Sequence, residues 1–331
     1  MSDLKSIAVS GEDLLMDPAW DALVATAGNV FQTSHFLLSW WRDTISSRPG
    51  SELLGVKIMD GSAVIGACAF EKRDDTLMFA GGRNVVDYMG PAAVHGREKE
   101  VAEAVVRFAF KEVSWDRALF AGLVANDAMC EEVVAAIRSS SPDATLDSYD
   151  QVPRIDEAPD GYLNLLNSKR RIELLRKRKR LAEVVGKVEV VSSNDSSWPE
   201  ALEILLAWKA NASPAMGDFV AEYGNFMRSL MASLAPSGIG NVVELRAGER
   251  CLASAIVLSF RGSKLLYNMS YDLALAKDGP SGLSPGVVLV SHLVEEALDS
   301  GWRFDFLKGA QDYKLRLGGK PLDMVAITVE R

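Results

Sequence analysis

The stretch FAFKEVSWDRALFAG (108–122) returns later in the chain as EEALDSGWRFDFLKG (295–309). Each copy reads as the end of a helix, a Trp, a short strand and a Gly. The copies lie in opposite halves of a 331-residue chain, which is long enough for two domains. Because a true repeat decides the architecture before any single motif does, the pattern predicts a duplicated fold.

Three predicted strands precede each copy, separated by short turns that include Asp-Gly and Arg-Gly. In the first half the strands are LLGVKIM (53–59), SAVIGACAF (62–70) and TLMFA (76–80). In the second half they are VVELR (242–246), CLASAIVLSF (251–260) and KLLYNMSY (264–271). Apolar runs joined by such turns are typical of an antiparallel β-meander.

The spacing within the two copies is equal. Asp60 and Trp115 are 55 positions apart, and so are Ala247 and Trp302. Each half therefore carries three antiparallel strands, a helix and a further strand. We expect an α/β (mixed α+β) fold with two tandem domains, each a mixed, largely antiparallel sheet flanked by helices.

A segment rich in Pro and acidic residues, QVPRIDEAPDG (151–161), predicts the boundary. The expected domains are 1–152 and 153–331, and the second includes a basic helix at 168–185. Further helices are expected at 162–185, 198–210 and 219–234.

Composition excludes several classes. The net charge is −9, and the acidic excess lies in residues 1–155, which disfavours a DNA-binding protein. Three separated cysteines fit a reducing compartment, and three histidines are too few for a His-rich metal site. No secretory signal or apolar run long enough to span a bilayer is visible, so the sequence predicts a cytoplasmic protein without a metal. The G-x-S-x-G, P-loop, HExxH and GxGxxG motifs do not occur in suitable contexts.

The segment SKRRIELLRKRKRLAEVV (168–185) is strongly basic. From Lys169 to Arg180 it holds eight basic residues and one acidic residue. One interpretation is a solvated charged face. A second is an anion-binding helix for the phosphates of a cofactor or substrate, with Lys169, Arg170, Arg171 and Arg178 as ligands. Contact with RNA or anionic lipid is a third, and the lack of interleaved aromatic residues disfavours it.

A helix start follows in SPGVVLVSHLVEEAL (284–298). Ser284 is a suitable N-cap and Pro285 suits the first turn. The N–H groups of Gly286, Val287 and Val288 could bind a phosphate at the positive end of the helix dipole. An ordinary well-capped helix is the alternative.

Polar residues follow the last predicted strand in RFDFLKGAQDYKLRLGG (303–319). Tyr313 could be a general acid and Asp312 a base, while Lys308 and Lys314 could contact an anion. Strand ends are common ligand sites in α/β sheets. A solvent-facing loop with an ordinary ion pair remains the alternative.

Several segments occur in an order that resembles a branch of the GNAT (N-acetyltransferase) superfamily. They are FQTSHFLLSWWR (31–42), DYMG (87–90), the basic helix, LSPG (283–286) and FDFLKG…DYK (304–314). The branch is often labelled the cellulose-biosynthesis (CelD/BcsL-type) acetyltransferases, and it is similar in layout to the Fem-type peptidoglycan aminoacyl transferases. The resemblance runs from about Phe31 to Lys314.

The resemblance implies two GNAT-like domains, a degenerate N-terminal one and a C-terminal acyltransferase. An acyl group, expected to be acetyl, would pass from acyl-CoA to an amine or hydroxyl of a small molecule, sugar or polysaccharide precursor. The pantetheine would lie between the strands KLLYNMSY and RFDFL, with Tyr271 at the end of the first. The pyrophosphate would bind at Ser284–Val288, where Ser-Pro-Gly replaces the usual Q/R-x-x-G-x-G/A signature.

The implied mechanism is direct attack on the thioester, with a base, a polarising backbone N–H and an acid for the leaving thiolate. Asp312, Tyr313 and Asp305 are the catalytic candidates. The resemblance leaves two alternatives open. One is a Fem-like transferase that uses aminoacyl-tRNA, with RNA on the basic helix. The other is a non-catalytic partner in polysaccharide synthesis or export.

Overall fold

A computed structural model describes residues 4–193, 197–278 and 283–331. Its contacts divide the chain into two compact units. Unit one comprises residues 1–151 and 322–331, and unit two comprises residues 152–321. The prediction that the second domain runs to residue 331 is therefore wrong.

The last strand, β13 (Lys320–Glu330), explains this difference. From Met324 onwards it pairs antiparallel with β6 (Arg117–Val124), and it lies between β6 and β7 (Thr145–Ile155) in the sheet. A strand buried between two neighbours satisfies its backbone groups on both edges. Its local sequence gives no sign that its hydrogen-bonding partner lies 200 residues earlier in the chain.

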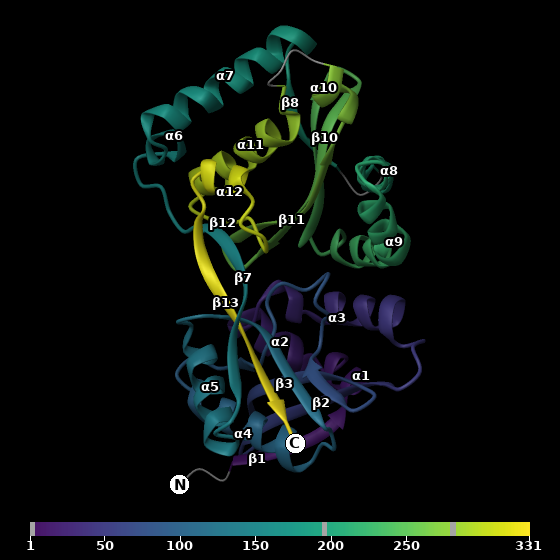
Figure 1. Ribbon diagram of the computed structural model, residues 1–331, viewed down its shortest axis with the longest axis vertical. Coiled ribbons are helices and arrows are strands. Elements are labelled where there is room, and N and C mark those ends of the chain that lie inside the picture. Colours follow the sequence, from purple (N-terminus) through teal and green to yellow (C-terminus); the bar gives the residue numbers. More distant parts are fainter. Residues whose placement is uncertain (1–3, 194–196, 279–282) are drawn as a thin grey trace. The chain divides into compact units, whose positions relative to one another are not determined.

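Unit one is a sheet with helices on both faces (Figure 1). The strand order is β1-β2-β3-β4-β6-β13-β7, and β4 and β6 are parallel. The first strands are β1 (Leu4–Ser10), β2 (Ser51–Asp60), β3 (Ala63–Arg73), β4 (Thr76–Phe79) and the short β5 (Ala92–Ala93). The helices are α1 (Gly11–Leu15), α2 (Pro18–Ala27), α3 (Ser34–Trp40), α4 (Glu98–Lys111) and α5 (Ala128–Ser140).

The alternation of side chains along β2 sets the two faces of unit one. Val56 and Ile58 belong to the core that α4 and α5 complete. Gly55 faces the other way, where an added Cβ would lie 2.8 Å from Leu14 of α1. The period of two therefore buries β2 on both sides.

Unit two has the strand order β7-β12-β11-β10-β9-β8. Its own strands are β8 (Glu189–Ser192), β9 (Gly240–Ala247), β10 (Arg250–Phe260), β11 (Ser263–Tyr271) and β12 (Arg303–Asp305). Its helices are α6 (Tyr162–Leu165), α7 (Ser168–Val185), α8 (Trp198–Ala210), α9 (Pro214–Leu234), α10 (Leu273–Asp278), α11 (Pro285–Asp299) and α12 (Asp312–Arg316). Figure 1 shows β10 and β11 between α11 on one side and α8 and α9 on the other.

Two predicted helix boundaries need correction. The helix expected at 162–185 is two helices, because Asn167 interrupts it and accepts a hydrogen bond from the Arg170 N–H at 3.0 Å. Asn167, and not Ser168, is thus the N-cap of α7. The helix expected at 219–234 begins at Pro214, since Ser213 caps it.

The duplication is visible in the positions of the elements. Corresponding elements begin 187 residues apart: β3 and β10 at Ala63 and Arg250, β4 and β11 at Thr76 and Ser263, α4 and α11 at Glu98 and Pro285. Gly122 and Gly309, which end the two copies of the opening stretch, both adopt positive φ, at 81° and 90°. The mixed, largely antiparallel sheet flanked by helices is as predicted for each half.

Candidate functional site

An opening in the sheet of unit two begins where β11 and β12 part. The two strands are parallel and pair at three positions, the last being Leu265 with Asp305. β12 ends there, whereas β11 continues to Tyr271. Beyond Leu265, β11 therefore has no β12 residue beside it. The resemblance places the pantetheine between these two strands, and their pairing ends at this point.

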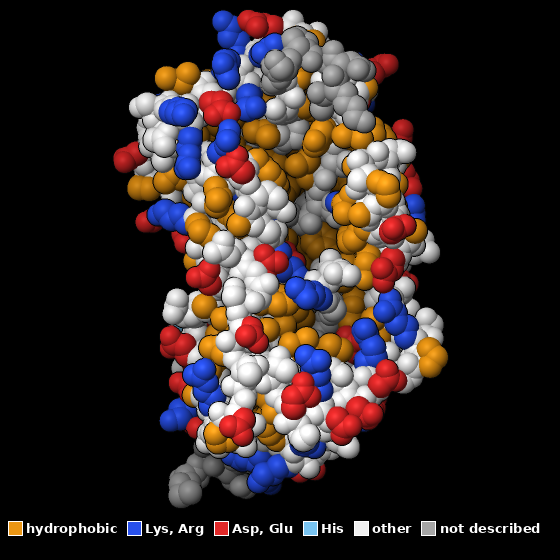
Figure 2. All heavy atoms as spheres, in the orientation of Figure 1, with side chains coloured by type: hydrophobic (Ala, Val, Ile, Leu, Met, Phe, Trp, Pro, Cys, Tyr) orange, Lys and Arg blue, Asp and Glu red, His pale blue; other side chains and the backbone are white. Residues whose placement is uncertain are grey.

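A β-bulge marks the same place on β11. Its pairing with β10 passes from Asn268–Ile256 to Leu266–Val257, so Tyr267 is the extra residue. A bulge bends its strand and increases the local twist, and bulges are frequent next to active sites. Figure 2 shows unit two hollowed between the side that carries α11 and α12 and the side that carries α8 and α9, with hydrophobic side chains on the walls.

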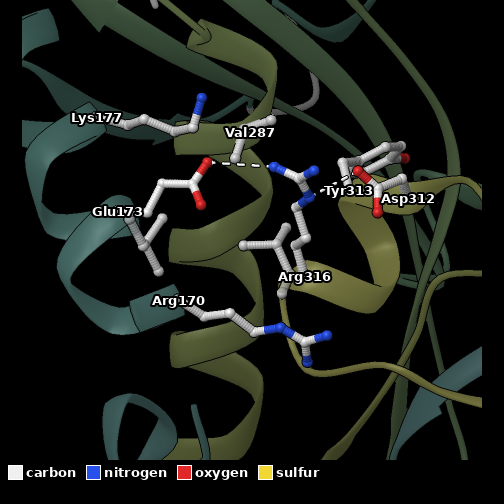
Figure 3. A pocket seen from close by; sticks show the side chains of 9 residues that line it. Arg170, Glu173, Lys177, Val287, Asp312, Tyr313 and Arg316 are labelled. Atoms are coloured by element: carbon white, nitrogen blue, oxygen red, sulfur yellow. Dashed lines mark hydrogen bonds and ion pairs between the residues drawn. The ribbon is translucent and has the colours of Figure 1, made fainter. Parts of the chain in front are cut away.

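A pocket of about 130 Å³ lies on the α11 side, among α7, the first turn of α11, and α12. Figure 3 shows the side chains that line it. They are Arg170, Glu173, Leu174, Lys177, Val287, Asp312, Tyr313, Arg316 and Leu317. Three elements that are far apart in sequence thus build one concave surface.

The pocket's two carboxylates share one cation. Arg316 lies between them, with Nε 2.6 Å from Asp312 Oδ2 and Nη1 3.4 Å from Glu173 Oε1 (Figure 3). This pairing disfavours Asp312 as a free base. Two cations of α7, Arg170 and Lys177, remain at the pocket, and Lys177 Nζ donates to Ser284 Oγ at 3.1 Å. Positive charge thus reaches the start of α11.

Tyr313 stands in the first turn of α12 and packs against the core of unit two. Burial raises its pKa to about 12, so the hydroxyl keeps its proton at neutral pH. A protonated phenol at the edge of a pocket can donate a proton to a developing anion. The role of general acid stays a prediction for Tyr313.

The start of α11 differs from the prediction in detail. Ser284 makes no capping hydrogen bond with its side chain, and the N–H of Val288 donates to the Ser284 carbonyl at 3.0 Å. Gly286 packs on β11, where an added Cβ would lie 2.9 Å from Met269 Sδ and 3.0 Å from the Tyr271 ring. Gly286 is thus needed for helix–strand packing, and Val288 is not available to an anion.

The loop after β12 is held by two residues that the sequence assigned to chemistry. Asp305 is only 4% exposed, and its Oδ1 accepts the N–H of Leu307, which has a φ of +58°. Lys314 is 5% exposed and donates to the carbonyl oxygens of Leu307 and Lys308, at 3.1 and 2.6 Å. These contacts fix the turn that leads into α12. They disfavour a catalytic Asp305 and an anion contact at Lys314, whereas at Lys308 they involve only the backbone carbonyl.

The four anion ligands predicted on α7 do not lie at one site. Arg178 donates to Ser291 and Glu295 of α11, and Arg171 donates to Asn164. Lys169 is exposed. Only Arg170 of the four lines the pocket. Glu173 and Lys177 were not predicted as site residues, although their spacing from Arg170 places all three on one helical face.

The corresponding place in unit one is filled by the chain itself. β4 stops at Phe79, and the following segment includes the buried Val85 and Val86 before β5 rejoins β3. Met89 N–H donates to the Gly122 carbonyl at the end of β6, at 3.0 Å. The strand that runs on as β11 in unit two is thus interrupted in unit one, and the intervening loop packs where unit two has its opening.

Residues 168–315 match the family model of the acetyltransferase (GNAT) domain. The match lies within unit two and covers less than half of the chain, and it supports a GNAT-type acetyltransferase domain in that segment. The fold has the predicted class, two tandem halves that each hold a mixed, largely antiparallel sheet flanked by helices. No protein of curated function matches the chain at the sequence level.

Solved structures support the fold across both units. FemX aligns with a TM-score of 0.61 at 9% identity, covering 97% of this chain and 96% of FemX. L-PGS from Bacillus licheniformis aligns with a TM-score of 0.59 at 13% identity, covering 94% and 91%. A conserved protein of unknown function from Bacteroides thetaiotaomicron VPI-5482 aligns with a TM-score of 0.58 at 13% identity over 100% of both chains. At these identities the similarity establishes the fold alone.

Within 4–193, 197–278 and 283–331, no helix is long and apolar enough to cross a membrane. In the same ranges, no three His, Cys, Asp or Glu side chains are grouped so that they could hold a metal ion.

Proposed function

We propose that unit two is an acyltransferase that moves an acyl group, with acetyl as the first candidate, from acyl-CoA to an amine or hydroxyl. The proposed acceptor is a small molecule, sugar or polysaccharide precursor, as the resemblance to the cellulose-biosynthesis branch implies. The observation that carries the proposal is the parting of β11 from β12 at a bulge, within a segment that matches the GNAT domain.

The residues present suit an acyl-CoA. A strand edge without a β12 neighbour can pair with the amides of an extended chain such as pantetheine. Arg170 and Lys177 stand beside the start of α11, where cations and a helix N-terminus together favour phosphate groups. The co-substrate would supply a thioester, whose acyl carbon is open to attack by the acceptor.

Tyr313 has the central chemical role in this proposal. Its hydroxyl, which a pKa of about 12 keeps protonated at neutral pH, would donate a proton to the departing thiolate. The phenolate would then recover a proton through solvent, which takes up the one that the acceptor loses on attack. The turn held by Asp305 and Lys314 positions Tyr313. These two residues act through Tyr313 and are positioning residues.

We assign no donor site to unit one. Its own loop, with Met89 bonded to Gly122, packs where the opening would lie, which supports the idea of a degenerate copy. The proposal places the reaction in the cytoplasm. Cys68, Cys130 and Cys251 are all free thiols, as a reducing compartment would keep them.

Calorimetric titration with acetyl-CoA tests the proposal. We expect binding, and we expect the double variant Arg170→Gln/Lys177→Gln to weaken it on the order of a hundredfold, since each charged hydrogen bond contributes about tenfold. A matched control, Arg107→Gln/Lys111→Gln, removes two exposed cations of α4 and should bind like the parent. Absence of binding to any acyl-CoA would refute the proposal, and salt-dependent binding of tRNA in its place would favour the aminoacyl-tRNA alternative.

A further inference from the structure

The face of α7 that points away from unit two combines exposed aliphatic side chains with exposed positive charge. The helix buries Leu174 and Leu181 against unit two. On its opposite side Ile172 is 65% exposed and Leu175 is 44% exposed. Large aliphatic side chains at this exposure, side by side on one helix, leave apolar area in water that a monomer's own folding does not require.

Cations surround these two residues. Three exposed cations lie on the same side of the helix as Ile172: Lys169, Arg176 and Lys179. They stand three residues before Ile172 and four and seven residues after it, spacings that place side chains on one helical face. The facing acid, Glu183, is 3.7 Å from Lys179 in a pair so exposed that it contributes little. Figure 2 shows Lys and Arg side chains gathered along α7 with hydrophobic side chains among them.

Three other cations of α7 are already used inside unit two. Lys177 bonds to Ser284, Arg178 to Glu295 and Arg171 to Asn164. The cations of the outer face, by contrast, are exposed to solvent. We define the outer face of α7 by its five side chains: Lys169, Ile172, Leu175, Arg176 and Lys179.

We propose that the outer face of α7 docks on a bilayer surface rich in anionic phospholipid. Aliphatic side chains enter the boundary between headgroups and acyl chains, while Lys and Arg remain at the phosphates. An anionic leaflet attracts each such cation. Single-stranded nucleic acid would instead call for aromatic side chains on which bases stack, and this face carries none.

Docking would also set the place of the reaction. The edge of α7 that carries Arg170 and Lys177 lines the pocket, so a helix held on the membrane keeps that pocket close to the lipid surface. The inference does not depend on the proposed acyl transfer, because the exposed side chains and their charges are independent of the pocket's chemistry.

Vesicle co-sedimentation of the full-length protein tests the proposal. We expect binding to vesicles of phosphatidylcholine with phosphatidylglycerol, and none to phosphatidylcholine alone. Arg176→Gln/Lys179→Gln should lower the partition coefficient at least about tenfold, and added salt should act in the same direction. Ile172→Gln/Leu175→Gln should lower it about tenfold at low salt as well, because the apolar contribution is lost.

The matched control is Arg107→Gln/Lys111→Gln, which removes equal charge from an exposed face of α4. It should sediment with anionic vesicles like the parent protein, and circular dichroism should show all three variants folded. An equal loss in the control, or full binding by Ile172→Gln/Leu175→Gln, would show that net charge alone drives the association and would overturn the proposal. So would binding to an RNA oligonucleotide without binding to either vesicle.

Discussion

Arg178 Nη1 of α7 lies 2.8 Å from Glu295 Oε2 of α11, and the Nε of the same guanidinium donates to Ser291 Oγ at 3.0 Å. The two charged side chains are 16% and 29% exposed. The contact fastens together the two longest helices that border the pocket. Arg178 belongs to a basic segment that looks suited to ligand binding, yet its side chain holds α7 against α11.

Replacing Arg178 should loosen that wall. We expect Arg178→Ala to lower the free energy of unfolding by about 1–2 kcal/mol, between the values for exposed and fully buried ion pairs. Urea denaturation measures this change. Arg176→Ala on the exposed side of the same helix should stay within about 0.5 kcal/mol of the parent. If both variants lowered the free energy of unfolding equally, the contact between Arg178 and Glu295 would not be a source of stability.

Lys314 should behave as a structural lysine. Lys314→Met leaves the carbonyl oxygens of Leu307 and Lys308 without their buried donor, so we expect a loss of about 1–3 kcal/mol in urea. Lys187→Met, at an exposed position, is the control. A stable Lys314→Met protein that had lost only ligand affinity would restore the anion-contact role that the sequence suggested.

Tyr313→Phe separates chemistry from binding. Under the proposed function, kcat should fall about a hundredfold, as expected for loss of a general acid, while the Kd for acyl-CoA stays unchanged. Because the pKa of Tyr313 is about 12, its titration should not limit the rate of the parent between pH 7 and 9. Tyr162→Phe is the matched control, since its hydroxyl donates to the Leu317 carbonyl and should affect stability without changing kcat. An unchanged kcat in Tyr313→Phe would remove Tyr313 from the mechanism.

His292 gives the protein an acid sensitivity. Burial lowers its pKa, the nearby Arg178 lowers it further, and Glu295 opposes both. The folded state therefore favours the neutral imidazole, while the unfolded chain takes up a proton near pH 6.5. The contribution of His292 to the free energy of unfolding should therefore be constant above pH 6.5 and should fall as the pH drops below that value.

Urea midpoints at pH 7.5 and pH 5 test this expectation. The difference between them should be smaller for His292→Gln than for the parent, because the glutamine cannot charge. His95→Gln, at a fully exposed site, serves as the control. A His292→Gln protein with the same acid sensitivity as the parent would mean that other groups account for it.

Much of the fold could be predicted from local sequence. The hairpins around Gly61 and Gly248 follow from turns that require positive φ, which both glycines adopt. The equal spacing to Trp115 and Trp302 exposed the duplication. By contrast, the place of β13 could not be read locally, because an apolar strand pairs equally well with any open edge until the rest of the sheet is built.

The candidate site was predicted less completely than the fold. Tyr313 and Arg170 do meet at one pocket, but Lys177 and Arg316 were missed. The sequence shows which residues are cationic. Only the contacts of each Lys or Arg in the folded protein show whether it can bind a ligand or is held in a structural contact. The contact of Asp305 could not be predicted for the same reason, because its hydrogen bond from the Leu307 N–H depends on how the loop turns.

Local sequence was sufficient to predict the duplicated meander, helix and strand of the two halves, because hairpin turns and apolar periods act between residues close in the chain. Which charged side chains form contacts within the fold depends instead on how the helices pack. Lys177 meets Ser284 across 107 positions, and Arg178 meets Glu295 across 117. Such pairs form only once α7 packs on α11. The same packing, which turns Leu174 inward and Ile172 outward, left one face of a uniformly basic segment to the pocket and the other to solvent.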